Sequence, residues 1–140
     1  MLFRSIESTI LDTTVDPIQV LRHGGIPIED LETLLGTTIT HAAGATRAPG
    51  MLASHYAPRC RVLLAETADD AADLVGTLPP SSRIIDAPSS VSVYAATLYE
   101  SLRRCDVEGL THAVFVLPPN LGLGRAIRDR LERAATDQTP

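Results

Sequence analysis

The sequence predicts an α/β protein whose second half forms a small parallel sheet with flanking helices. From residue 59 onward, short apolar runs alternate with longer segments whose apolar residues recur every three or four positions. The last of these runs, 111–117, is almost continuously apolar, as in strands that are covered on both faces. Alternating strands and helices favour parallel pairing through helical crossovers. The expected architecture is Rossmann-like, and the fold alone says nothing about function.

Strands are expected at residues 60–65, 83–87 and 111–117, with a helix after each. Thr67 should cap the first helix, because Asp70 three residues later completes a capping box. A helix should also start at Gly122-Leu123-Gly124. This motif is not a dinucleotide-binding fingerprint, because the third glycine is missing and the motif follows the last strand of the unit instead of the first. The apolar stripes of the three helices are Ala71, Leu74, Val75 and Leu78; Val91, Tyr94, Ala95, Leu98, Leu102 and Cys105; and Leu123, Ala126, Ile127, Leu131, Ala134 and Ala135.

The first half predicts a hairpin followed by a helix. Two β-favouring runs, 8–11 and 18–21, flank a turn-rich stretch. Pro27 suits the first position of a helix and Gly36 suits its end. Residues 37–47 have the composition of a mobile connector. Leu31, Leu34 and Leu35 should form one apolar face of the helix.

The charge pattern argues against tight nucleic-acid binding. The net charge is −5, all twelve basic residues are arginines, and no basic stripe is present. The mildly positive last helix is interpreted as a solvated face in preference to a phosphate-binding one. Its arginines are Arg125, Arg128, Arg130 and Arg133.

Targeting and metal signals are absent from the sequence. The first twelve residues contain charges, and no run approaches eighteen apolar residues, so we expect a cytoplasmic protein without membrane contact. Cys60 and Cys105 are interpreted as two isolated, reduced thiols. The four histidines share no ligand spacing with each other or with the cysteines, so no metal site is predicted.

Residues 48–58, with the sequence APGMLASHYAP, have the wrong composition for a passive tether. Proline at both ends stiffens the segment, and the adjacent His55 and Tyr56 can hydrogen-bond, stack and titrate. Such a loop could close over a ligand. An ordered connector whose Met51 and Tyr56 merely pack is an equally weighted alternative.

These residues resemble the interdomain linker of the long, two-domain L-threonylcarbamoyladenylate synthases. Residues 6–12 (IESTILD) and 20–26 (VLRHGGI) are similar to the end of that family's YrdC-like catalytic domain. Residues 122–124 and 130–135 are similar to the end of its C-terminal domain. The motifs occur in the family's order and are spread over nearly the whole chain.

The resemblance implies three regions: a remnant of the YrdC-like domain at 1–40, an interdomain linker or lid at 41–58, and a Rossmann-like C-terminal domain at 59–140. It also implies a reaction that joins L-threonine, bicarbonate and ATP into threonylcarbamoyl-adenylate with release of pyrophosphate. Partner proteins would transfer the product to tRNA. ATP, accompanied by Mg²⁺, would be a substrate, with no tightly bound cofactor.

The resemblance assigns roles to individual residues, none of them catalytic. It implies that Ser8 contacts L-threonine, although a strand-end hydroxyl bonded to backbone is the plainer interpretation. It implies that Arg22 contacts ATP, a role that a surface salt bridge would equally explain. The family usually has proline at the position of His23. In the lid, Tyr56 would contact the nucleotide, His55 could bond a phosphate or orient the loop, and Pro49 and Gly50 would shape it.

Most of the catalytic domain of such a synthase would precede residue 1, so we expect this chain to be inactive alone. Two explanations stay open: a fragment of a full synthase, or a free-standing module that docks onto a separate catalytic subunit. A nucleotide-binding Rossmann-like domain of unrelated function is a further alternative.

Overall fold

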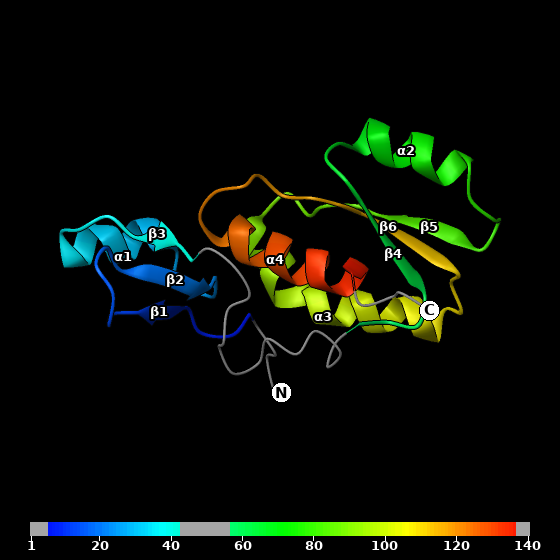
Figure 1. The fold of residues 1–140 in the computed structure, drawn as a ribbon. Helices are drawn as coiled ribbons and strands as arrows, with labels where there is room; N and C mark the ends of the chain where they lie inside the picture. The colour runs from blue at the N-terminus through cyan, green and yellow to red at the C-terminus, as the bar shows by residue number, and fades with distance from the viewer. Residues whose placement is uncertain (1–5, 43–56, 137–140) are drawn as a thin grey trace.

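The computed structural model describes residues 6–42 and 57–136, which form two α/β units (Figure 1). The first unit contains β1 (Ile10–Asp12), β2 (Gln19–Arg22), α1 (Ile28–Leu35) and β3 (Thr40–His41). The second unit contains β4 (Arg61–Ala65), α2 (Ala68–Gly76), β5 (Ser82–Ile85), α3 (Val91–Val107), β6 (His112–Val116) and α4 (Leu123–Thr136). The predicted α/β class, with strands and helices alternating through the second half, is confirmed.

The sheet of the second unit is parallel throughout, in the order β4-β6-β5. Helices α3 and α4 cover one face and α2 covers the other (Figure 1). Central strand β6 serves both layers: Ala113 and Phe115 pack with α3 and α4, and Val114 and Val116 pack toward α2. Since successive side chains of a strand point to opposite faces, the nearly continuous apolar run is explained by burial on both sides.

The helix signals of the second unit are confirmed. The Thr67 hydroxyl accepts a hydrogen bond from the Asp70 amide at 3.1 Å, and the Asp70 carboxylate accepts one from the Thr67 amide at 3.1 Å. Helix α4 begins at Leu123, directly after Gly122, whose φ is +52°. The predicted stripe of α3 is buried except for Val91, which is 38% exposed, and Tyr99 is also buried there.

The hairpin of the first unit is confirmed, with β1 antiparallel to β2. The connector predicted at residues 37–47 is wrong for Thr40 and His41, which form β3 parallel to β2. The Thr40 amide donates to the Ile18 carbonyl at 2.9 Å. A two-residue strand carries no periodicity, so only its partner reveals it.

The bounds of α1 match the prediction, but its buried face does not. The helix follows Pro27 and ends at Gly36, which adopts a left-handed φ of 65°. Leu34 is 80% exposed and Leu35 is 47% exposed, so most of the predicted apolar face does not pack against the core. The small core takes in only the start of the helix; its members are Val20, Ile28 and Ile39, with Leu11, Ile18 and Leu31 packed against it.

Cys60 and Cys105 form no disulfide with each other, and they are not isolated from each other. Both are buried in the apolar cluster beneath α3 and α4. Hydrogen bonding to Cys105, together with burial, raises the pKa of Cys60. The pair therefore behaves as part of the core.

Candidate functional site

Residues 6–9 pass from the second unit into the first. Ile6 is 7% exposed and belongs to the apolar cluster of α3 and α4. The Gly25 amide donates to the Glu7 carbonyl at 2.9 Å, and the Thr9 hydroxyl donates to the Ile26 carbonyl at 2.6 Å. A Cβ at Gly24 would lie 2.3 Å from backbone atoms of residues 7–9, so glycine is required for this close approach.

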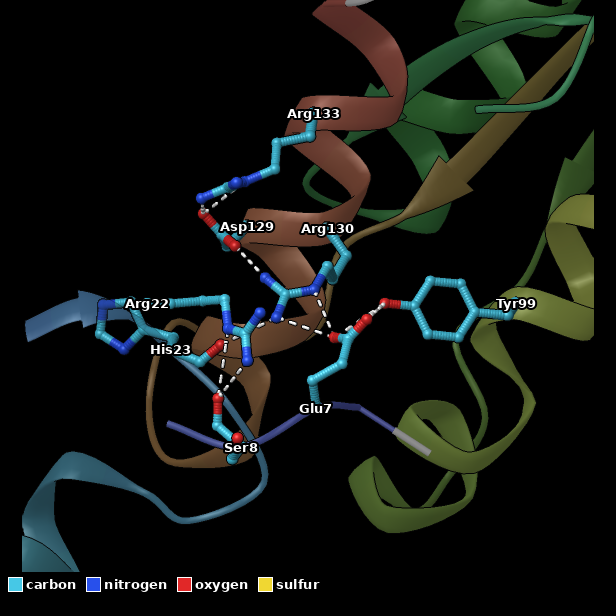
Figure 2. Close-up of polar contacts among 8 residues, drawn as sticks. All are labelled: Glu7, Ser8, Arg22, His23, Tyr99, Asp129, Arg130 and Arg133. Carbon is cyan, nitrogen blue, oxygen red and sulfur yellow. Dashed lines mark hydrogen bonds and ion pairs between the residues drawn. The ribbon is translucent and has the colours of Figure 1, made fainter. Parts of the chain in front are cut away.

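Ser8 and Arg22, the two predicted substrate residues within the described ranges, lie together. Arg22 ends β2 and is 9% exposed, and Ser8 is exposed. The Arg22 guanidinium donates to the Ser8 carbonyl from Nε at 3.2 Å and from a terminal nitrogen at 3.0 Å (Figure 2). This contact uses the backbone of Ser8 and not its hydroxyl. The roles in threonine and ATP binding stay predictions.

Next to Ser8, the carboxylate of Glu7 is held by two side chains of the second unit (Figure 2). Arg130 of α4 approaches Glu7 Oε2 through both Nε and a terminal nitrogen, each at 3.0 Å. The Tyr99 hydroxyl of α3 lies 3.0 Å from both carboxylate oxygens. We call these three residues the Glu7 clamp.

The electrostatic environment keeps Glu7 ionised, and it keeps Arg130 and Tyr99 protonated. Burial opposes ionisation of Glu7, but its hydrogen bonds and the charge of Arg130 outweigh burial and lower its pKa below the usual value. Burial also opposes the charge of Arg130, yet the carboxylates of Asp129 and Glu7 raise its pKa. Burial foremost raises the pKa of Tyr99 to about 12. At neutral pH the carboxylate is therefore charged, and both partners carry their protons.

Further contacts orient Arg130. One terminal nitrogen donates to the His23 carbonyl at 3.3 Å, and the other pairs with Asp129. Asp129 in turn accepts from Arg133 at 3.0 and 3.2 Å. Arg130 is 8% exposed, and the side chains of Arg125, Arg128 and Arg133 are only 28%, 15% and 22% exposed, so the interpretation of the α4 arginines as a solvated face is wrong. Its partner Glu7 lies too far away in sequence for helical spacing to reveal.

A second polar bridge joins α1 to the start of α4. Glu29 forms an ion pair with Arg125 at 3.0 Å and accepts a hydrogen bond from the Gly122 amide at 3.4 Å. The other Glu29 oxygen is buried and has no hydrogen-bond partner within the described ranges. This bridge joins the first unit to the second in addition to the contacts of Ile6, Glu7 and His23.

Two histidines of the first unit lie together. The ring centroids of His23 and His41 are 5.2 Å apart, a pairing that depends on β3 and was not foreseen. Burial foremost, and then the nearby His41, lowers the pKa of His23, while the carboxylates of Asp129 and Glu29 partly oppose this shift. A neutral imidazole at His23 is therefore favoured.

The sequence prediction covers only part of this site. It named Ser8 and Arg22 as separate candidates, without predicting their contact, and it missed Glu7, Tyr99 and Arg130. The available signals were a carboxylate beside Ser8, a tyrosine next to the predicted α3 stripe, and an arginine next to buried Leu131. The lid residues Pro49, Gly50, His55 and Tyr56 lie outside the described residues.

Two absences apply to residues 6–42 and 57–136. Within these ranges no three His, Cys, Asp or Glu side chains are grouped to hold a metal ion. None of the helices there is both long and apolar enough to span a membrane. The polar chemistry of the site consists of hydroxyl, carboxylate, guanidinium and imidazole groups.

Comparisons with known proteins agree with the resemblance. The family described as "Threonylcarbamoyl-AMP synthase, C-terminal domain" matches residues 26–136. The chain is 28% identical to the threonylcarbamoyl-AMP synthase of Pyrococcus abyssi, over 93% of this chain and 46% of the relative. It is 26% identical to that of Bacillus subtilis, over 93% of this chain and 45% of the relative.

Solved structures show the same relationship. The crystal structure of P. abyssi Sua5 complexed with L-threonine superposes with a TM-score of 0.77 at 27% identity, covering 94% of this chain and 46% of that one. A variant of P. abyssi Sua5 with adjacent histidine and tyrosine replaced by alanine gives a TM-score of 0.75 at 26% identity, covering 93% and 45%.

The chain therefore spans about half the length of the relatives it matches. Because the family match extends over most of its residues and the fold agrees, the chain belongs to the threonylcarbamoyl-AMP synthase family and carries the family's C-terminal domain.

Proposed function

We propose that this chain works in the synthesis of threonylcarbamoyl-AMP from L-threonine, bicarbonate and ATP, as the C-terminal portion of the synthase. The product would pass to threonylcarbamoyl-transfer proteins for tRNA modification. The chain supplies one edge of the substrate site, and the rest of a catalytic domain supplies the remainder. Family membership leaves the alternative of an unrelated nucleotide-binding domain without support.

The observation that carries this proposal is the contact between Ser8 and Arg22. The Arg22 guanidinium holds the Ser8 carbonyl, and Ser8 as a residue is exposed to solvent. A serine hydroxyl on a backbone held in this way can both donate to and accept from an amino-acid substrate. The L-threonine bound by the P. abyssi relative supports threonine as that substrate.

The lid is the second part of the proposal. We assign Tyr56 to contact with ATP, through its phenol or by its ring against adenine, and His55 to support of the same segment. Stacking of an aromatic ring on a base is worth about 1–3 kcal/mol. The P. abyssi relative has been solved with an adjacent histidine and tyrosine replaced by alanine, and this chain has such a pair at residues 55 and 56. Closing the lid would exclude water from a labile mixed anhydride.

A chimera tests the function. Residues 1–140 would replace the matching part of the P. abyssi protein, and pyrophosphate release would be measured with and without L-threonine and bicarbonate. We expect activity that depends on both. Ser8→Ala should raise KM for L-threonine roughly fivefold, the value of a hydrogen bond worth about 1 kcal/mol. Thr13→Ala, in the exposed turn after β1, is the matched control and should leave KM unchanged.

Two outcomes would contradict the proposal. One is a folded chimera without threonine-dependent pyrophosphate release. The other is robust release by residues 1–140 alone, since this chain should need the rest of a catalytic domain. A further experiment adds the chain to the remaining part of the P. abyssi protein as a separate polypeptide. Activity of the mixture would show that the chain can dock in trans, and activity of the fused chimera alone would show that a covalent connection is required.

A further inference from the structure

Consecutive residues of the segment 6–9 are held from different directions. Ile6 is anchored in the apolar cluster of α3 and α4, and the Glu7 carboxylate is held by Arg130 and Tyr99. The Ser8 carbonyl is held by Arg22, which belongs to the first unit. Ser8 is the exposed residue among them. The residue before Ser8 and the backbone carbonyl of Ser8 itself are therefore both held in place.

We propose that Arg130 and Tyr99 are positioning residues for the substrate site: through Glu7 they set the place of the Ser8 hydroxyl. The inference rests on the proposed function, because the role of Ser8 in threonine binding belongs to that proposal. It gives the Rossmann-like unit a direct task at the substrate site, although none of its own described residues is assigned to a substrate.

Backbone geometry makes this transmission effective. Peptide groups are planar, so only two soft dihedrals, ψ of Glu7 and φ of Ser8, lie between the Cα atoms of the two residues. The Gly25 amide fixes the Glu7 carbonyl at 2.9 Å, and Arg22 fixes the next carbonyl along the chain. A shift of Glu7 must therefore move Ser8 or break one of these hydrogen bonds. Displacements of about 1 Å at a site of this kind are enough to impair it.

The chemistry of the Glu7 clamp also favours positioning over simple stability. A buried ion pair is often no more stabilising than apolar residues of similar volume. What it adds is direction: two guanidinium nitrogens and one phenol converge on a single carboxylate at 3.0 Å. Asp129 and the His23 carbonyl fix the orientation of Arg130 in turn. Such a charged fork defines where the carboxylate lies more narrowly than apolar packing would.

The first test uses residues 1–140 and solution NMR. Arg130→Met and Tyr99→Phe should both shift the Ser8 amide resonance and speed exchange of the Gly25 amide, by at least about tenfold for Arg130→Met. Arg104→Met is the matched control, because it removes an arginine from an exposed ion pair on α3. That control should leave Ser8 and Gly25 unchanged.

Two further measurements separate positioning from general destabilisation. In the wild type, the Ser8 resonance should titrate with the Glu7 carboxylate, and Glu7→Gln should abolish that titration. The double variant Glu7→Arg with Arg130→Glu should restore slow exchange at Gly25. If Arg130→Met fails to fold, Tyr99→Phe still tests the inference, because this variant removes only a single hydroxyl. An unchanged Ser8 resonance in folded Tyr99→Phe, or no titration of Ser8 in the wild type, would overturn the inference.

The chimera supplies the second test. Arg130→Met should raise KM for L-threonine about tenfold and leave KM for ATP unchanged, because one substrate contact is misplaced. A loss of folding would instead lower activity for both substrates together. If the wild-type chimera is inactive while Ser8 responds to the Glu7 clamp, the proposed function fails and the positioning stands. If the chimera is active and Ser8 does not respond, the positioning fails.

Discussion

Glu7 and Arg130 are 123 residues apart in sequence, and in the structure their side chains form an ion pair at 3.0 Å. The arginine is 8% exposed and the carboxylate 33% exposed, so the pair is shielded mainly on the arginine side. It connects the beginning of the described chain to α4. The two units are therefore joined by charge as well as by the apolar contact of Ile6.

Breaking this ion pair should destabilise the fold. Arg130→Met leaves Glu7 without its cationic partner, and we expect the free energy of unfolding to fall by about 1–3 kcal/mol. Arg133→Met is the control: Asp129 keeps its contact with Arg130, so the loss should be below about 1 kcal/mol. Urea unfolding followed by circular dichroism measures both. Equal losses would show that Glu7 is not specially dependent on Arg130.

Acid should weaken the Glu7 clamp. Because the pKa of Glu7 is lowered in the folded state, its stabilising effect is complete above the ordinary value of 4.5. The effect is lost as the pH falls from 4.5 through the folded-state pKa. Urea midpoints of the wild type should therefore fall more steeply below pH 4.5 than those of Glu7→Gln. Parallel curves for the two proteins would contradict this.

His23 should produce a separate pH dependence at higher pH. Burial foremost lowers its pKa below 6.5 in the folded state, so the unfolded chain binds the proton more readily. Stability should decline as the pH falls below about 6.5 and level off once the folded imidazole is also protonated. The groups facing His23 are His41, Arg125, Asp129 and Glu29. In His23→Gln, the free energy of unfolding should depend less on pH between about 6.5 and the plateau. An unchanged slope would show that another group causes the pH dependence.

Gly24 should not tolerate a methyl group. In Gly24→Ala the new Cβ would meet backbone atoms of residues 7–9 at 2.3 Å, and backbone cannot move aside as a flexible side chain can. We expect a loss of about 1–3 kcal/mol or more in the free energy of unfolding. Gly76→Ala, at the end of α2, meets nothing within 4 Å and should be neutral or stabilising by up to about 1 kcal/mol. Thermal and urea unfolding of both variants compare the two sites.

Much of the second unit follows from local signals in the sequence. The Thr67–Asp70 capping box, the apolar stripes of α2 and α3 and the continuous run of β6 all predict elements that the structure contains. These signals work because a cap or a helical face depends on residues only three or four positions apart. The order of the motifs likewise identified the family.

Tertiary structure alone decided which surfaces meet. Thr40 and His41 are a strand only because β2 lies beside them, and Leu34 and Leu35 stay exposed because the first unit's core ends before they reach it. The arginines of α4 look alike in the sequence, yet Arg130 is buried against a carboxylate from the start of the described chain. Local periodicity describes the shape of each element. The packing between elements is set by contacts between residues far apart in sequence, and these appear only once the chain has folded.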